Sequence, residues 1–277
     1  MSANCSVFIQ TLNEEENLPR CLACFAWSDD IVVLDSISQD RTEQIARAAG
    51  ARFFQREYRG RAENQNWAVE NIRFKHPWVY YSDADEVMPA ALAREIQDLT
   101  ARPDNPHAAY RLRRRDHFMG KWIKHSSQYP LWFVRLFRPE KIRWTRKANP
   151  VAQVDGSVGD LTNDYLHYPF SKGLSDWLWR HNRYSTYEAE ENLRSLNEGD
   201  LRWRQIFSPD QAQRRRALKT LSFRLPARPL LKFLYMYFLR LGLLDGRPGF
   251  HYCLLQAMYE YQIALKLREL RRKETSC

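Results

Sequence analysis

Short apolar runs alternate with helical patterns over the first hundred residues of the chain. The helical stretches are predicted to begin after Asn13, after Ser38 and near Pro89. Asn13 and Ser38 are predicted to cap the first two of these helices. Strands that alternate with helices predict an α/β fold built on a mostly parallel sheet. The predicted buried strands are residues 6–10, 31–34, 53–54 and 78–81.

The pattern changes at about residue 108. Residues 110–112 and 131–137 have the composition of antiparallel strands, and a loop-rich segment follows from 138 to 168. A long amphipathic helix is predicted from about Lys172, and the last third of the chain is helical and basic. We therefore expect an α/β domain at residues 1–170 and a helical, basic and amphipathic C-terminal region at residues 171–277.

Polar clusters follow three of the predicted strands. They are residues 11–14 after the first strand, 35–36 after the second and 83–85 after the fourth. In open α/β sheets, ligands bind outside the carboxyl ends of the strands. The sequence therefore predicts one binding site along that edge of the sheet.

Asp83 and Asp85 are the most informative pair of residues in these clusters. Residues two apart in a strand point the same way, and a strand end lets a pair on a loop converge. Paired carboxylates select a hard ion such as Mg²⁺ or Mn²⁺, which usually completes its shell with substrate phosphates. A solvated acidic turn before the helix near Pro89 is the alternative interpretation.

The chain is strongly basic, with a formal net charge of +10 and a pI near 9.4. This balance predicts a polyanionic neighbour. No acidic residue lies between Asp210 and Asp245, and the same stretch holds eight basic residues. They are Arg214, Arg215, Arg216, Lys219, Arg224, Arg228, Lys232 and Arg240.

Apolar residues at helical spacing accompany these basic residues. Leu218, Leu221 and Leu225 predict an interfacial helix that faces an anionic membrane surface. A helix folded onto the α/β domain with its charges in water is the alternative. The apolar run 230–244 would span only ~22 Å as a helix, short of the ~30 Å hydrocarbon core, so it should not cross a bilayer. Nucleic acid is not an expected partner, because no recognised nucleic-acid motif accompanies the charge.

Cysteine usage and the N-terminus favour a reducing compartment. The five cysteines lack paired metal-ligand spacing, and Cys21 and Cys24 fit a helix as small apolar residues. The N-terminus runs directly into a predicted strand, without the pattern of a signal peptide. We therefore expect a protein that works on the cytoplasmic side of the membrane.

Three ordered motifs together resemble a known family. Residues 11–15, 35–42 and 83–86 resemble, in order and spacing, the nucleotide-sugar domain of family 2 glycosyltransferases. The similarity is greatest to the bacterial branch that adds glucose to lipopolysaccharide cores and other envelope glycans. Four later segments also resemble that branch, so the similarity covers nearly the whole chain. They are residues 135–137, 166–168, 181–185 and 244–247.

The resemblance implies a GT-A fold, a nucleotide-sugar donor and a divalent metal, Mg²⁺ or Mn²⁺. By position, Asp35 would contact the nucleobase or ribose, Asp83 the ribose or the metal, and Asp85 the metal. His167 would be a further metal ligand or phosphate contact, or a histidine packed among aromatic residues. Thr11, Asn13 and Glu14 would line the base and ribose pocket.

Position also makes Arg61 a candidate for the donor diphosphate. It lies in the segment 59–66, which precedes a predicted helix, and a solvated surface arginine is the alternative. Ile37 and Gln39 stand where relatives usually carry Gly and Thr. We expect the bulky side chain at position 37 to affect donor choice.

The general base is harder to place from the sequence. Relatives often carry His-Glu before a short strand, whereas the corresponding stretch here contains Asn149 and Pro150. Asp155, Asp160 and Asp164 are the candidate catalytic residues, with Asp155 favoured even though an Asp before Gly is often a turn former. Reduced or altered activity is the other explanation.

These observations predict a metal-dependent, inverting glycosyltransferase. It would move a hexose from a nucleotide sugar, which the resemblance implies is glucose from a UDP-linked donor. The acceptor would be a lipid-linked or lipopolysaccharide-type glycan, and the protein would be peripheral at the cytoplasmic face of a bacterial inner membrane. The alternative is a catalytically inactive, glycosyltransferase-like scaffold or membrane-binding protein. A phosphatase is disfavoured because no nucleophile motif follows the first strand.

Overall fold

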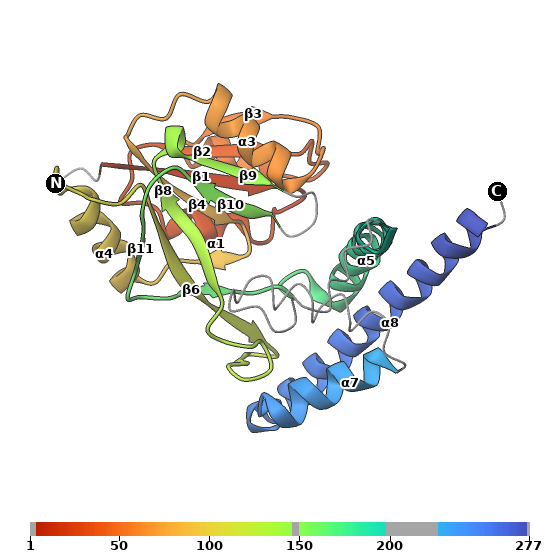
Figure 1. Ribbon diagram of the computed structural model, residues 1–277. Helices are drawn as coiled ribbons and strands as arrows, with labels where there is room; N and C mark the ends of the chain where they lie inside the picture. Colours follow the sequence, from red (N-terminus) through yellow and green to blue (C-terminus); the bar gives the residue numbers. More distant parts are fainter. Residues whose placement is uncertain (1–3, 146–149, 198–226, 276–277) are drawn as a thin grey trace. The chain divides into compact units, whose positions relative to one another are not determined.

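The computed structural model describes residues 4–145, 150–197 and 227–275 (Figure 1). The chain divides into two compact units. Unit 1 comprises Met1–Trp122 and Tyr129–Lys172, and unit 2 comprises Ile123–Gln128 and Gly173–Cys277. Unit 2 therefore includes a short segment from within the sequence of unit 1.

Four parallel strands form the first half of the sheet in unit 1. The register pairs Thr11 with Asp35 and Gln10 with Asp83, so the polar clusters that follow these strands lie along one edge. In order across the sheet, the strands are β3 (Arg52–Gln55), β2 (Ile31–Asp35), β1 (Cys5–Thr11) and β4 (Trp78–Asp83). The four predicted strands and their parallel arrangement are confirmed.

The sheet continues beyond β4 through antiparallel and mixed pairings. Strand β8 (Trp132–Phe137) is antiparallel to both β4 and β6 (Ala109–Phe118), which confirms the predicted antiparallel strands. β12 (Tyr165–His167) lies between β6 and β5 (Glu86–Val87). The other strands are β7 (Lys121–Trp122) and β11 (Val158–Asp160) against β6, and the separate pair β9 (Ile142–Thr145) and β10 (Val151–Val154).

Helices cover both faces of this sheet, because alternate strand residues are apolar on each face. On β4, Trp78 and Tyr80 belong to one core cluster, and Val79 and Tyr81 belong to the other. Residues of α1 and α4 pack in the first cluster, and residues of α3 pack in the second. The helical elements of unit 1 are α1 (Leu18–Ala23), α2 (Thr42–Ala48), α3 (Arg61–Asn71), α4 (Ala90–Thr100) and η1 (Pro139–Lys141).

Unit 2 is helical. The predicted long helix is present as α5 (Gly173–Asn197), and both α5 and α7 (Arg228–Leu234) pack against α8 (Arg247–Thr275). The apolar run 230–244 is divided among α7, the π-helical η3 (Tyr235–Leu239) and the 3-10 helix η4 (Gly242–Asp245). In the part of the chain that the structure describes, no helix combines the length and apolar character of a membrane span. The predicted interfacial helix around Leu218 lies outside the described residues.

Two predicted helix caps are wrong. α1 begins at Leu18 and α2 at Thr42, each several residues after the expected cap. Asn13 instead has a left-handed backbone, with φ of +54°, and its Oδ1 accepts a hydrogen bond from the backbone N–H of Gln39. Ser38 donates its hydroxyl to Asp35. Both residues therefore belong to loop contacts rather than to helix ends.

Candidate active site

The loops after β1 and β2 are joined by hydrogen bonds. The backbone N–H of Asn13 donates to Ser38 Oγ at 2.7 Å, and Gln39 N–H donates to Asn13 Oδ1 at 2.8 Å. The N–H of Glu14 donates to Thr42 Oγ1 at 2.8 Å. Each loop thus fixes the other, and Asn13 and Glu14 sit on a pre-ordered edge of the sheet.

Asp35 is fully buried and organises the loop that follows it. Its Oδ1 accepts the hydroxyls of Thr11 and Ser38 at 2.8 and 2.5 Å, and its Oδ2 accepts the N–H of Ser38 at 2.7 Å. Buried carboxylates require such partners. The structure thus gives Asp35 a positioning role, and its contact with a nucleobase or ribose stays a prediction.

Asp83 is engaged by two arginines. Arg61, the first residue of α3, pairs with its Oδ2, and Arg135 of β8 lies 3.0 Å from the same oxygen. Burial opposes ionisation, but the charges of Arg61 and Arg135 hold the pKa of the Asp83 carboxyl well below its usual range. Asp83 is therefore anionic, and its carboxylate already has cationic partners.

Arg135 also holds the carboxylate that begins β5. Arg135 and Glu86 form an ion pair, and both side chains are almost completely buried. Burial raises the pKa of Glu86, although the charge of Arg135 opposes that rise. Arg135 therefore ties the end of β4 to β5.

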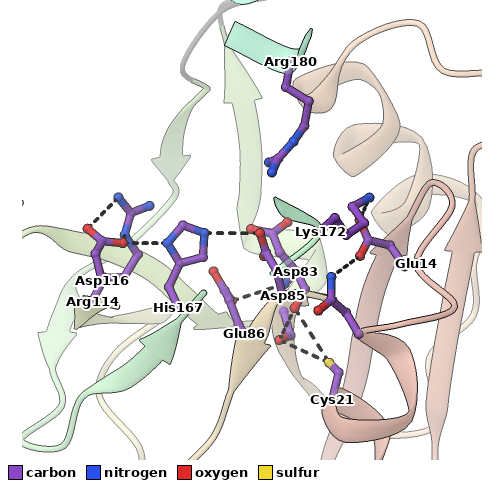
Figure 2. Close-up of polar contacts among 12 residues, drawn as sticks. Glu14, Cys21, Asp83, Asp85, Glu86, Arg114, Asp116, His167, Lys172 and Arg180 are labelled. Carbon is purple, nitrogen blue, oxygen red and sulfur yellow. Dashed lines mark hydrogen bonds and ion pairs between the residues drawn. The ribbon is translucent and has the colours of Figure 1, made fainter. Parts of the chain in front are cut away.

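Asp85 lies in a chain of charged groups with His167 and Asp116 (Figure 2). His167 Nε2 is 3.4 Å from Asp85 Oδ2, and His167 Nδ1 is 2.6 Å from Asp116 Oδ1. Arg114 Nε lies 2.8 Å from that same Asp116 oxygen. The parallel register of β12 and β6 places His167 directly opposite Asp116.

The protonation of this chain follows from burial and charge. Burial favours neutral imidazole, but the charge of Asp85 and the contact with Asp116 outweigh it and raise the pKa of His167 to about 9. Burial likewise opposes ionisation of Asp116, but Arg114 and His167 lower its pKa. In the metal-free protein, His167 is therefore a cation between two carboxylates.

Glu14 and Lys172 border the same site. Lys172 Nζ is 2.7 Å from Glu14 Oε1 and donates to the backbone carbonyl of Asn13 at 3.1 Å. Burial raises the pKa of Glu14 against the charge of Lys172, and the negative charge of Asp85 adds to the rise. Glu14 and Asp85 therefore act on one another electrostatically at this edge of the sheet.

The predicted metal ligands are only partly brought together. Among the described residues, no group of three or more His, Cys, Asp or Glu side chains is arranged to hold a metal ion. Asp83 faces its arginines, while Asp85 and His167 face one another. A histidine whose second nitrogen is held by a carboxylate is typical of metal ligands. Since Mg²⁺ and Mn²⁺ accept waters and substrate phosphates, the pair Asp85 and His167 fits such an ion.

The three candidate bases lie in ion pairs. Asp155 Oδ2 is 2.7 Å from Lys141 Nζ. Asp160 Oδ1 is 2.6 Å from Nε of Arg111, near the start of β6. Arg111 and Asp116 are five residues apart on that strand, about 17 Å at the usual strand rise. Asp160 therefore lies toward the start of β6, away from the part of the strand that carries Asp116. Asp164 is buried and contacts Arg113, Arg115 and Tyr129 at 2.7, 2.6 and 2.9 Å.

Sequence reasoning did not identify Asp116 or Lys172 as part of the site. Asp116 directly follows three consecutive arginines in β6, and the alternation of side chains along a strand places it on the same face as Arg114. This alternation could have indicated from the sequence that Asp116 and Arg114 lie together. Lys172 follows β12 by several residues and contacts residues about 160 positions earlier, so no local pattern could indicate it.

The chain is similar to a curated protein and to solved structures. The lipopolysaccharide core biosynthesis glycosyltransferase LpsC of Rhizobium meliloti is 28% identical over 95% of this chain and 91% of its own. The crystal structure of Staphylococcus aureus TarS 1–349 covers 97% of this chain and 91% of its own, with a TM-score of 0.43 and 14% identity. Glucosyl-3-phosphoglycerate synthase from Mycobacterium tuberculosis, in complex with Mn²⁺ and UDP, is 19% identical with a TM-score of 0.37, over 50% of this chain and 57% of its own.

The family model described as glycosyl transferase family 2 matches residues 6–160, more than half of the chain. This match and the mostly parallel sheet confirm the predicted fold class, a GT-A α/β domain followed by a helical C-terminal region. The chain therefore belongs to glycosyl transferase family 2 and is a glycosyltransferase.

Proposed function

We propose that the protein transfers a hexose, specifically glucose, from a UDP-linked donor to a lipid-linked or lipopolysaccharide-type envelope glycan, with inversion and with Mg²⁺ or Mn²⁺. Membership of glycosyl transferase family 2 supports the reaction class. The relative named as a lipopolysaccharide core biosynthesis glycosyltransferase supports the acceptor class.

The observation that carries this proposal is the pair Asp85 and His167 at the carboxyl edge of the sheet. These two side chains would hold the divalent ion, and Asp116 would orient the imidazole through Nδ1. When bound, the ion would stabilise the negative charge that develops on the departing diphosphate.

The donor would lie along the two joined loops. Thr11, Asn13, Glu14 and Asp35 would shape the base and ribose pocket, in which Asp35 holds the β2 loop in place. Arg61 pairs with Asp83 and keeps its side chain 41% exposed. Arg61 could therefore also contact a diphosphate, whereas Arg135 is buried.

A catalytically inactive, donor-binding relative is a second candidate. One observation favours it: the aspartates Asp155, Asp160 and Asp164 each contact an arginine or lysine. A base must reach the acceptor hydroxyl. Donor binding without turnover on any acceptor would support the inactive relative over the enzyme.

We also propose that the protein is peripheral at the cytoplasmic face of a bacterial inner membrane. A lipid-linked acceptor resides in that membrane, and the excess of basic residues between Asp210 and Asp245 suits an anionic surface. Nucleic acid is not part of the proposal.

Calorimetric titration with UDP, GDP and CMP, each with and without Mn²⁺, tests the donor site. We expect Mn²⁺-dependent binding of UDP that Asp85→Ala removes, because the ion loses its carboxylate ligand. Asp98→Ala is the matched control, since Asp98 is an exposed aspartate on α4. Failure of the wild type to bind any of the three nucleotides would contradict the proposed transferase.

A further inference from the structure

Exposed apolar side chains are concentrated on α7, η3, η4 and α8 of unit 2. Leu239 is 77% exposed, and Leu230 and Leu244 are each 56% exposed. Fourteen large hydrophobic side chains between residues 230 and 265 are exposed, against five in the described part of unit 1. The fourteen, which we call the α7–α8 apolar surface, are Leu230, Leu231, Leu234, Tyr235, Phe238, Leu239, Leu241, Leu243, Leu244, Phe250, Leu254, Met258, Tyr261 and Leu265.

Helix α8 has two apolar faces, of which only one is covered. Its first face is buried, with Cys253, Ala257, Ile263 and Leu267 each at most 8% exposed. Its second face repeats every three or four residues and is exposed from Phe250 to Leu265. Because that spacing keeps side chains on one stripe of a helix, the second face is continuous. Contiguous exposed apolar patches mark interaction sites.

Packing within unit 2 uses the neighbouring sides of α7 and α8 and reaches the first residue of the exposed face, Phe250. Arg228 of α7 and Glu260 of α8 form an ion pair at 2.8 Å, and Phe233 and Phe250 meet edge to face with ring centroids 5.8 Å apart. α7 and α8 lie side by side (Figure 1). The exposed side chains are therefore those left over after α7 has packed on α8.

The charges that accompany the surface are cationic. Lys232, Arg240 and Arg247 lie on or beside its elements. Between residues 227 and 259 the one acidic residue is Asp245. It is 3% exposed and accepts hydrogen bonds from the N–H and hydroxyl of Ser126 at 2.7 and 2.6 Å. On α8, Glu260 also lies within the span of the surface, but it pairs with Arg228 and its side chain is 14% exposed, so the exposed charge beside the surface is mainly cationic.

We infer that the α7–α8 apolar surface inserts into the interfacial layer of an anionic lipid bilayer. Apolar side chains edged by Lys and Arg are the composition of interfacial membrane-binding elements. A second copy of the chain fits less well, because a two-fold contact would place the same cationic elements against one another. This inference deepens the proposed membrane attachment and rests on the proposed function for the lipid-linked acceptor.

Vesicle sedimentation of the full-length protein tests the inference. The probes are vesicles of phosphatidylcholine alone and of phosphatidylcholine with phosphatidylglycerol. The test variant combines Leu239→Asp with Leu244→Asp, two exposed positions where a charge leaves the core unchanged. Met119→Asp is the control, because Met119 is 60% exposed and lies in unit 1. We expect the wild type and the control to bind the vesicles with phosphatidylglycerol more tightly than those of phosphatidylcholine alone. We expect the double variant to bind the vesicles with phosphatidylglycerol at least tenfold more weakly than the wild type does.

Equal binding of the double variant and the wild type to anionic vesicles would overturn the inference. Sedimentation velocity without vesicles adds a second check: a wild-type dimer that the double variant dissociates, with vesicle binding unchanged, would make this surface a contact between copies. Titration with UDP and Mn²⁺ separates the two proposals. If the wild type binds UDP but no vesicles, the membrane-binding surface is contradicted and the donor site is not. If vesicle binding is lost in the double variant, the membrane-binding surface is supported even when UDP does not bind.

Discussion

Ile37 adopts a backbone conformation that its side chain disfavours. Its φ is +63°, in the left-handed region, where a β-branched residue is an outlier. The following residue, Ser38, donates its N–H and hydroxyl to Asp35, so the loop contacts hold the strained residue in place. Ile37, next to the contacts that join the loops after β1 and β2, therefore stores backbone strain.

Replacement of Ile37 by Gly should relieve this strain. The left-handed conformation costs roughly 1–2 kcal/mol and the added flexibility of glycine costs roughly 0.5–1 kcal/mol, so we expect a net stabilisation of about 0.5–1 kcal/mol. We also expect a several-fold change in affinity for the sugar nucleotide, because the 49% exposed side chain leaves the loop. Denaturant unfolding and calorimetry measure the two effects.

Leu241→Gly is the matched control for Ile37→Gly. Leu241 has a φ of +59° and belongs to unit 2, so glycine there should relieve similar strain and leave nucleotide affinity unchanged. Sugar-nucleotide affinity in Ile37→Gly equal to that of the wild type would count against a role of position 37 in donor choice.

Asp116 is the residue on which the orientation of His167 depends. Asp116→Asn keeps the shape but removes the charge that holds Nδ1 at 2.6 Å. Since outer carboxylates of this kind typically contribute 10–100-fold to metal affinity, we expect Mn²⁺ to support UDP binding about 10–100-fold more weakly. Calorimetric titration of Mn²⁺ at fixed UDP measures the change.

The exposed Asp98 supplies the control for this substitution, as Asp98→Asn changes one charge on α4 without contacting the site. Circular dichroism should show that both variants remain folded. Unchanged Mn²⁺ dependence in Asp116→Asn would contradict this prediction. It would mean either that His167 binds the metal without help from Asp116 or that His167 does not bind the metal.

The residue types at the site were predictable, but the directions of their side chains were not. Asp83 and Asp85 were expected to converge on one ion. Asp83 turns instead to Arg135, 52 positions later in the chain, and Asp85 faces His167. Local alternation indicates which side of a strand a residue occupies, whereas these directions depend on partners from distant strands.

At the scale of the elements, strands were easier to predict than helix ends. Buried parallel strands are nearly continuous apolar runs, and all four were found. Asn13 and Ser38 have the side chains of helix caps, but the neighbouring loop offered each a competing hydrogen bond. Polar side chains favour caps and loops for the same reason, so their type alone cannot separate the two.

The turn between η4 and α8 explains why glycines surround Asp245. Gly246 has a φ of +72°, and a Cβ added at Gly249 would lie 2.3 Å from the carbonyl oxygen of Gly242. The tight turn positions Asp245 to accept the N–H groups of His125 and Ser126 at 3.0 and 2.7 Å. Residues 244–247, noted in the sequence for their resemblance to relatives, thus fix a segment 120 positions away.

At the scale of the whole molecule, that contact makes the division of the chain discontinuous. A single boundary near residue 170 was expected from the change of pattern. The segment Ile123–Gln128 nevertheless belongs with the C-terminal helices. The two core clusters of the sheet, in contrast, lie entirely between Cys5 and Tyr165. The sheet therefore has a complete core without the residues that follow Lys172.

We expect a fragment of residues 1–172 to fold with the segment 123–128 released. Its β1 and β4 amides should stay protected from hydrogen exchange, because the buried core is intact, whereas the amides of His125 and Ser126 should exchange freely without their Asp245 acceptor. Full-length Asp245→Ala is the control and should release the same two amides. Mass-spectrometric hydrogen exchange measures both proteins. A fragment without protected β1 and β4 amides would show that the sheet needs the C-terminal helices to fold.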